Sequence, residues 1–185
     1  MAAGTVPPPH PYIQQIEHLF YNYRLAYFNR RYYTVLLGRK RRFDLANQLF
    51  FTLSTAIAMV ALSLIPPALT AWREQITIGA SCIAGLSFLL SIALAIMGWS
   101  QSISDLHSRV NAWHRAERLV LSGIRFILHT AESMRDAELQ VQFADSAYFA
   151  ADDLPDADRE NKKLELAILR EIEISIPPDY VWRVL

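Results

Sequence analysis

The stretch 45-LANQLFFTLSTAIAMVALSLIPPALTAW-72 contains no Asp, Glu, Lys, Arg or His, and the same holds for 75-QITIGASCIAGLSFLLSIALAIMGWSQSIS-104. Only Arg73 and Glu74 separate the two stretches. A membrane-spanning helix needs about 20 apolar residues, because it rises roughly 1.5 Å per residue through a hydrocarbon core about 30 Å thick. Both stretches are long enough, and the short connection makes them antiparallel. The sequence therefore predicts an all-α membrane protein built on a transmembrane helical hairpin.

Proline sets the expected end of the first span. We expect this span over residues 45–65, because the rings of Pro66 and Pro67 remove a backbone donor and clash with the preceding helical turn. The second span is expected over residues 78–98, and the whole hairpin then occupies residues 45–101. The connection between the two spans is expected to be a loop.

Basic residues indicate how the hairpin is oriented. Residues 1–44 contain seven basic and two acidic side chains, a net charge of +5. Residues 105–185 contain ten basic and fifteen acidic ones, a net charge of −5, but several arginines follow the second span closely. The connection holds Arg73 beside Glu74. The positive-inside rule therefore predicts that both termini are cytoplasmic and that the connection lies outside.

The remaining parts of the chain are expected to be mostly helical. Residues 1–11 contain four prolines among small residues and are expected to be flexible. Residues 12–44 have aromatic and apolar side chains at helical spacing, which predicts an amphipathic, basic and aromatic helix. Residues 102–185 are expected to form a cytoplasmic helical region. It begins with an uninterrupted stalk over 102–149 and ends with a helix from Asp156, as N-cap, to Ile174.

Both predicted spans carry small or polar side chains at helical spacing. Such a face allows helices to pack closely and to hydrogen-bond across a seam, and it equally tolerates water in a pore. No charged residue lies inside either span, which disfavours an ion-coupled transporter. The candidate pore-lining residues are Gln48, Thr52, Thr55, Thr77, Ser81 and Ser91.

Basic residues before the first span form a second candidate site. In a cyclic oligomer they would repeat around the axis and attract anions such as nucleotides, and the neighbouring aromatic side chains suit stacking on bases. The alternatives are contacts with anionic lipid headgroups and packing against a neighbouring helix. The candidate ligand-binding residues are Arg30, Arg31, Arg39, Lys40, Arg41 and Arg42.

Glu117 interrupts the apolar stripe of the predicted stalk between Trp113 and Val120. A carboxylate in such a position needs a partner, because burying an unpaired charge is costly. We expect an ion pair with an arginine of the N-terminal helix, Arg24 or Arg31.

The sequence contains none of the common catalytic patterns. It has no G-x-S-x-G, no G-x-x-x-x-G-K-[ST], no H-E-x-x-H and no glycine-rich dinucleotide turn. Cys82 is the only cysteine, so that neither a disulfide framework nor a cysteine-based metal motif is possible. We therefore expect no enzymatic activity, no cofactor and no metal centre.

The segments 23-YRLAYFNRRYY-33 and 107-HSRVNAWHRAE-117, on either side of the hairpin, give the chain a characteristic layout. This layout of amphipathic helix, membrane hairpin and helical cytoplasmic tail resembles the SLATT family of bacterial two-transmembrane effectors. The resemblance covers nearly the whole chain. It implies a pore-forming effector of an anti-phage, abortive-infection system in the bacterial inner membrane. Such effectors are encoded beside a sensor or a nucleotidyltransferase that makes a nucleotide signal.

Together, the residues and the resemblance predict a cyclic homo-oligomer, taken to be a tetramer, surrounded by membrane lipids. It would conduct ions when a nucleotide or oligonucleotide ligand, made by a partner nucleotidyltransferase or similar sensor, changes the cytoplasmic helices. The alternative is a non-conducting membrane anchor whose cytoplasmic helices recruit a sensor or an enzyme.

Overall fold

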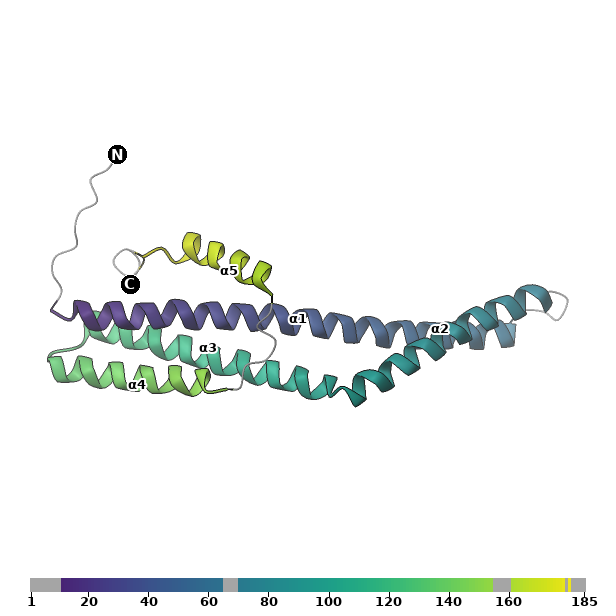
Figure 1. The fold of residues 1–185 in the computed structure, drawn as a ribbon, viewed down its shortest axis with the longest axis horizontal. Helices are drawn as coiled ribbons and strands as arrows, with labels where there is room; N and C mark the ends of the chain where they lie inside the picture. The colour runs from purple at the N-terminus through teal and green to yellow at the C-terminus, as the bar shows by residue number, and fades with distance from the viewer. Residues whose placement is uncertain (1–10, 65–69, 155–160, 179, 181–185) are drawn as a thin grey trace, which may run out of the picture. The chain divides into compact units, whose positions relative to one another are not determined.

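The computed structural model describes residues 11–64, 70–154, 161–178 and 180. Within these residues the chain is helical apart from short turns, with five helices and no β-strand (Figure 1). Two helices are long and apolar enough to cross a membrane, as predicted. The terminal segment that was expected to be flexible lies almost entirely outside the described residues.

The first helix, α1, runs without a break from Ile13 to Leu64. The amphipathic helix predicted over 12–44 and the span predicted over 45–65 are therefore parts of one helix. No proline lies between them, and the run Arg39–Arg42 consists of good helix formers, so nothing in this region ends the helix. The two prolines predicted to end the span lie outside the described residues.

The second helix, α2, covers Thr70–Ile96. Residues 70–77 were predicted to belong to the loop between the spans, and this prediction is wrong, because they are helical. Helix α2 ends at Ile96 and does not continue directly into the next helix. Met97 and Gly98 form a turn, in which Gly98 has a φ of 67°. Glycine adopts this left-handed conformation without a steric cost, because it has no Cβ. The third helix, α3, then covers Trp99–His129.

The uninterrupted stalk predicted over 102–149 is also wrong, because α3 ends at His129 and α4 covers Met134–Asp152. Ser133 caps α4: its side chain accepts a hydrogen bond from the backbone N–H of Asp136 at 3.2 Å. A serine in this position satisfies one of the free donors at the start of a helix. This cap explains why a new helix begins here.

The last helix, α5, covers Lys162–Ser175 and is shorter than the predicted helix from Asp156 to Ile174. Its N-cap is Asn161, whose side chain accepts a hydrogen bond from the backbone N–H of Leu164 at 3.1 Å. Asparagine is as good an N-cap as aspartate, so the two could not be ranked from the sequence. The predicted cap, Asp156, lies outside the described residues.

The chain divides into two compact units. The hairpin unit comprises Leu36–Asp105, which includes the second part of α1, all of α2 and the start of α3. The bundle unit comprises the described residues of Met1–Val35 and Leu106–Leu185. Within the bundle unit, the first part of α1 packs with α3, α4 and α5 (Figure 1).

The core of the bundle unit combines large apolar side chains with alanines. Helix α4 turns Ala137, Ala144 and Ala151 inward, one every seven residues. Because these side chains are small, α4 can approach its neighbours closely. The apolar stripe predicted on the stalk is confirmed on α3, where the buried apolar side chains include Leu106, Trp113, Val120, Ile124 and Ile127.

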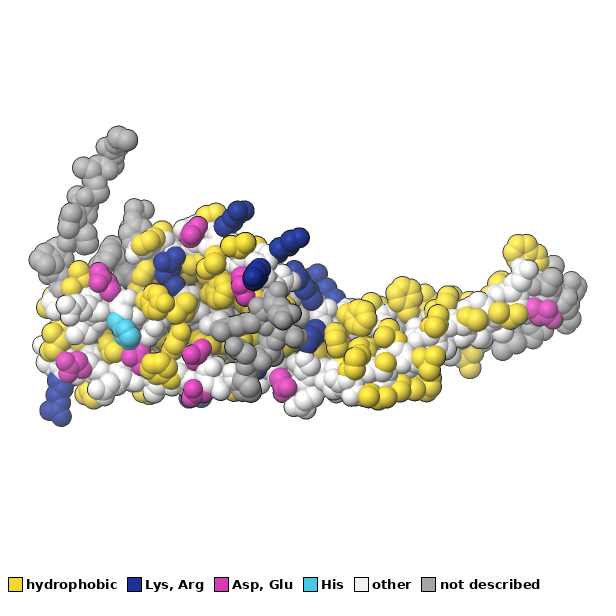
Figure 2. Space-filling model, viewed as in Figure 1, with side chains coloured by type: hydrophobic (Ala, Val, Ile, Leu, Met, Phe, Trp, Pro, Cys, Tyr) yellow, Lys and Arg dark blue, Asp and Glu magenta, His cyan; other side chains and the backbone are white. Residues whose placement is uncertain are grey.

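The hairpin unit distributes its side chains in the opposite way. Its buried positions include the polar residues Asn47, Ser54 and Ser87, whereas large apolar side chains cover its surface (Figure 2). Leu86 is 68% exposed and Ile96 is 81% exposed. Water disfavours such a surface, and continuous exposed apolar patches mark sites that another apolar phase covers. The distribution suits a pair of helices in lipid.

Candidate functional site

The two membrane-length helices pack along a seam of small and polar side chains. Asn47 Nδ2 donates a hydrogen bond across it to Ser91 Oγ at 2.8 Å. The Ser91 hydroxyl in turn donates to the carbonyl oxygen of Ser87 at 2.9 Å. Small residues and interhelical hydrogen bonds are what holds helices together in lipid. Among the described residues of the hairpin unit, the buried positions are Leu37, Asn47, Ser54, Ala80, Ser87 and Leu94.

The six predicted pore-lining residues fall into two groups. Ser91 is hydrogen-bonded at the seam, and Thr77 is half-buried, with no hydrogen-bond partner for its Oγ1 among the described residues. The other four are exposed on the hairpin unit, as Ser91 is too: Gln48, Thr52, Thr55 and Ser81.

Three of these exposed residues form a narrow line on α1, which we call the polar stripe: Gln48, Thr52 and Thr55. Their spacing of four and three residues places them on one face of the helix. The Thr52 hydroxyl donates to the carbonyl oxygen of Gln48 at 2.9 Å, and the Thr55 hydroxyl donates to that of Phe51 at 2.8 Å. These bonds satisfy the donors within the helix, so the stripe suits water, lipid or a neighbouring helix.

A cavity of about 210 Å³ in the hairpin unit is lined by residues of α1, α2 and the start of α3. Beside it the rings of Phe43 and Trp99 lie 5.6 Å apart. The Lys40 ammonium lies 5.2 Å from the centre of the Trp99 ring and donates to Ser102 Oγ at 2.6 Å. Tryptophan and lysine are typical of the membrane–water interface. We call this cavity the interface pocket; it is lined by Asp44, Asn47, Gln48, Ser91, Leu94, Ala95, Trp99 and Ser100.

The basic residues predicted to bind an anion are distributed around α1. Arg30 and Arg31 belong to the bundle unit, where each forms an ion pair with a glutamate. Residues 39–42 follow one another at steps of about 100° around the helix, so they point in different directions. Lys40 contacts Trp99, whereas Arg39, Arg41 and Arg42 are exposed.

Glu117 forms its ion pair with Arg30, so the predicted pairing with Arg24 or Arg31 is wrong. Arg31 instead pairs with Glu171 of α5, with its Nε 3.0 Å from Oε1. The Nε of Arg24 has no hydrogen-bond partner among the described residues. Arg30 follows the buried residue Ala26 by four positions, which places it on the inward face of α1.

The ion pair lies in a largely apolar part of the bundle unit. The side chain of Glu117 is 13% exposed and that of Arg30 is 29% exposed. Burial raises the pKa of the Glu117 carboxyl above its usual range, and the charges of Arg30 and His114 oppose this effect. Burial and the charge of Glu117 raise the pKa of the nearby Tyr23 hydroxyl to about 12. Desolvation therefore outweighs the attraction in this pair.

A double-mutant cycle tests this arrangement. We expect Arg30→Met or Glu117→Met alone to lower the free energy of unfolding by on the order of 2 kcal/mol, because each leaves an unpaired charge in a mostly buried place. The double variant should lose much less than the sum, since a buried pair can be replaced by apolar residues of similar volume. Denaturation of the full chain in detergent measures all three. Additive losses would show that the two side chains do not act as a pair.

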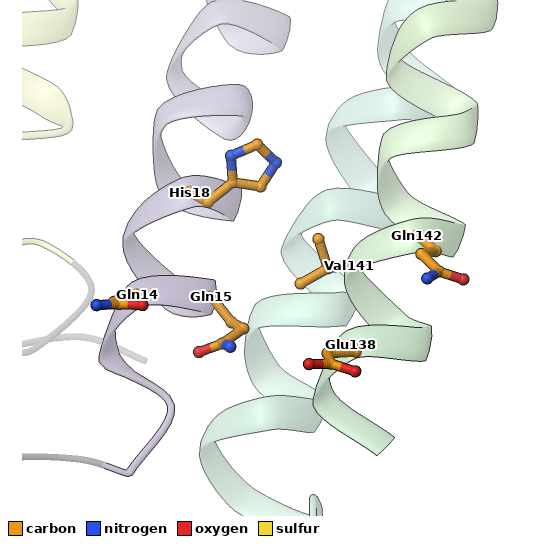
Figure 3. Close-up of a pocket in the computed structure, with 6 residues that line it drawn as sticks. All are labelled: Gln14, Gln15, His18, Glu138, Val141 and Gln142. Carbon is orange, nitrogen blue, oxygen red and sulfur yellow. The ribbon is translucent and has the colours of Figure 1, made fainter. Parts of the chain in front are cut away.

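A second polar region of the bundle unit joins α1 to α4. It includes a shallow cavity of about 270 Å³ (Figure 3). Asp145 accepts hydrogen bonds there from His18 Nε2 at 2.9 Å and from Asn22 Nδ2 at 2.8 Å. Neither the sequence pattern of α4 nor that of α1 indicated this contact. The residues that line the cavity are Gln14, Gln15, His18, Glu138, Val141 and Gln142.

The described residues contain no cluster of three or more His, Cys, Asp or Glu side chains suited to a metal ion.

Arg109 is buried and interacts with an aromatic ring, its guanidinium lying 5.4 Å from the centre of the Tyr33 ring. A cation above the face of an aromatic ring is a favourable contact. Comparisons of the chain with models of protein families, with curated proteins and with solved structures find no match.

Proposed function

We propose that this chain is a pore-forming membrane effector, whose hairpins assemble in the bacterial inner membrane around a path for ions. The observation that carries the proposal is the hairpin surface, which is covered by large apolar side chains and carries an exposed polar stripe on α1. A single hairpin of two helices cannot enclose a path. Conduction therefore requires a homo-oligomer, in which the polar stripe of each copy faces the centre and the apolar surface faces lipid.

The orientation follows from charge. The basic run that begins at Arg39 precedes the first span, and the rule that such residues stay inside places both termini in the cytoplasm. The bundle unit would then be reached by a cytoplasmic signal. The resemblance to SLATT effectors supports a role in anti-phage defence and a nucleotide or oligonucleotide as that signal.

Ion flux through proteoliposomes tests the proposal. The full chain is reconstituted alone and with cyclic dinucleotides as probes, and flux is followed with a potential-sensitive dye. We expect Thr52→Val combined with Thr55→Val to lower flux about tenfold, an increase in barrier of about 1.4 kcal/mol, because valine keeps the shape but removes the hydroxyl. Leu49→Val is the matched control, since Leu49 is exposed on the same helix but outside the polar stripe.

The self-contained hydrogen bonds of Thr52 and Thr55 favour a second function, a non-conducting anchor. In that case the polar stripe would face lipid or a neighbouring helix, and the bundle unit would recruit a partner. Intact oligomers without flux under both conditions would reject the pore and support the anchor.

A further inference from the structure

The interface pocket has a mainly apolar wall with polar groups on one part of it. Leu94, Ala95 and the Trp99 ring supply apolar surface, and Ser91 and Ser100 supply hydroxyls. The cavity of about 210 Å³ is smaller than the roughly 300 Å³ at which pockets for whole small molecules begin. It therefore suits one part of a larger amphipathic molecule.

The charges around the pocket are mainly positive. Residues 39–44 contain four basic side chains and one acidic one, a net charge of +3. Lys40 and Arg41 precede Asp44 by four and three positions, so the helix places both on the pocket side of α1, one turn away. The Lys40 ammonium lies 5.2 Å from the centre of the Trp99 ring, which lines the pocket. An anionic group beside the pocket therefore meets two cations, and Asp44 opposes their attraction only in part.

One donor in the lining lacks an acceptor. The indole Nε1–H of Trp99 is buried and has no hydrogen-bond partner among the described residues. A buried donor without an acceptor is unfavourable, and folded proteins contain few of them. The phosphate and ester oxygens of a phospholipid are acceptors, so a lipid at this residue supplies what the indole lacks.

The polar groups on α1, in contrast, still have free acceptors. The amide nitrogen of Asn47 donates to Ser91 Oγ at 2.8 Å, and that of Gln48 donates to Asp44 Oδ2 at 2.9 Å. Each of these amides keeps its oxygen as an acceptor. A ligand with hydroxyl groups matches them, because a hydroxyl donates a hydrogen bond without bringing a charge.

We propose that the interface pocket is a binding site for an anionic phospholipid with a hydroxylated headgroup, such as phosphatidylglycerol. Lys40 and Arg41 hold the phosphate, and the headgroup hydroxyls donate to the amide oxygens of Asn47 and Gln48. The acyl chains continue over the exposed large apolar side chains of the hairpin unit (Figure 2). The inference rests on the proposed function only in placing the hairpin in a membrane, and it does not require conduction.

Native mass spectrometry of the full chain in mild detergent, titrated with phosphatidylglycerol, measures the affinity of the site. We expect Lys40→Gln combined with Arg41→Gln to weaken binding about tenfold, a loss of about 1.4 kcal/mol. Arg39→Gln combined with Arg42→Gln is the matched control, because it removes the same charge from other faces of α1. The control pair should change the affinity less than threefold.

Trp99→Phe is a second variant, which removes the indole N–H but keeps an aromatic ring and the net charge. It should weaken lipid binding severalfold, while its melting temperature in lipid-free detergent stays equal to that of the wild type or rises. The variant keeps the test decisive if the Lys40 and Arg41 pair does not fold. Equal affinity of Trp99→Phe and the wild type would overturn the role of the indole in the site.

Two further probes define the ligand. Phosphatidylcholine with the same chains has no net charge and no hydroxyl in its headgroup, and it should bind at least tenfold more weakly. Glycerol 1-phosphate, which has the headgroup without the chains, should not displace the lipid at equal concentration. Equal binding of the two lipids, displacement by glycerol 1-phosphate, or equal losses in the two charge pairs would each overturn the lipid site. Selective lipid binding without flux would reject the pore but keep the site, whereas flux without selective binding would do the reverse.

Discussion

Leu86→Arg is expected to prevent stable insertion of the chain into the membrane, whereas Ile174→Arg is expected to have almost no effect. Leu86 lies in the middle of α2 and is 68% exposed; Ile174 lies in α5 of the bundle unit and is 83% exposed. An arginine at the centre of a membrane-spanning helix costs about 3 kcal/mol. The same side chain on a surface in water costs next to nothing, and it replaces an exposed apolar group there.

The measurement is the share of each variant that stays with membranes after alkaline extraction of bacterial cells. Wild type and Ile174→Arg should remain in the pellet, and Leu86→Arg should be degraded or released. Because both residues are exposed leucine-like side chains, the pair separates lipid exposure from a general effect of the added charge. Equal behaviour of the two variants would mean that the surface of α2 does not face lipid.

The hairpin could be predicted from the sequence because its signal is simple. Two charge-free stretches determine the presence of two membrane-length helices, whatever the details of their packing. The ends of the helices depend on weaker and more local effects. Thr70 begins α2 earlier than the apolar pattern suggested, because polar residues such as Arg73 and Glu74 fit into a helical turn as well as into a loop.

The break between α3 and α4 was missed, although the sequence contains a signal for it. Ser133 and Asp136 form the Ser-x-x-Asp pattern of a helix start, which competes with the apolar stripe that continues on both sides. An interpretation based on apolar spacing alone passes over such a cap, because the cap is made by polar side chains: Ser133 Oγ accepts from the backbone N–H of Asp136 and donates to Asp136 Oδ2.

The partner of Glu117 was missed for a different reason. The buried positions Ile16, Tyr23 and Leu37 of α1 are spaced by multiples of seven, and Arg30 occupies the place between Tyr23 and Leu37 in this series. The spacing therefore marks Arg30 as the inward-facing arginine. Which inward-facing residue of α3 it meets depends on how the two helices are rotated and shifted against each other, and this is set by the packing of all four helices.

The interface pocket could not be predicted from either helix by itself. Asp44, Asn47 and Gln48 appear in the sequence as the polar start of a span, for which contact with water or headgroups is a sufficient explanation. That they line a cavity together with Ser91 and Ser100 is visible only in the folded hairpin unit. Such a cavity depends on how the helices are shifted against each other. The spacing of residues along one helix does not determine this shift.

Gly123→Leu is expected to disrupt the bundle unit, because this glycine of α3 lies in close contact with α1 and α4. A Cβ at this position would lie 3.3 Å from Leu19 Cδ1, 3.7 Å from Ala144 Cβ and 3.8 Å from the carbonyl oxygen of Gln140. Leu19 and Ala144 are fully buried, so the further carbons of a leucine have no free space to enter. Overpacking of this kind costs about 3 kcal/mol, which exceeds the roughly 1 kcal/mol that leucine gains over glycine in a helix.

Two variants make the prediction specific, with thermal unfolding of the full chain in detergent as the measurement. Gly38→Leu is the control, because a Cβ on this helical glycine has no neighbour within 4 Å, and its melting temperature should stay equal or rise. Gly123→Ala should lie close to wild type, since its Cβ at 3.3 Å displaces only the flexible end of Leu19. From the highest to the lowest melting temperature, the expected order is therefore Gly38→Leu, Gly123→Ala and Gly123→Leu. The last variant should melt several degrees below the wild type. A Gly123→Leu variant as stable as Gly38→Leu would show that α3 is not held this closely by α1 and α4, and the inward-facing alanines of α4 would then need another explanation.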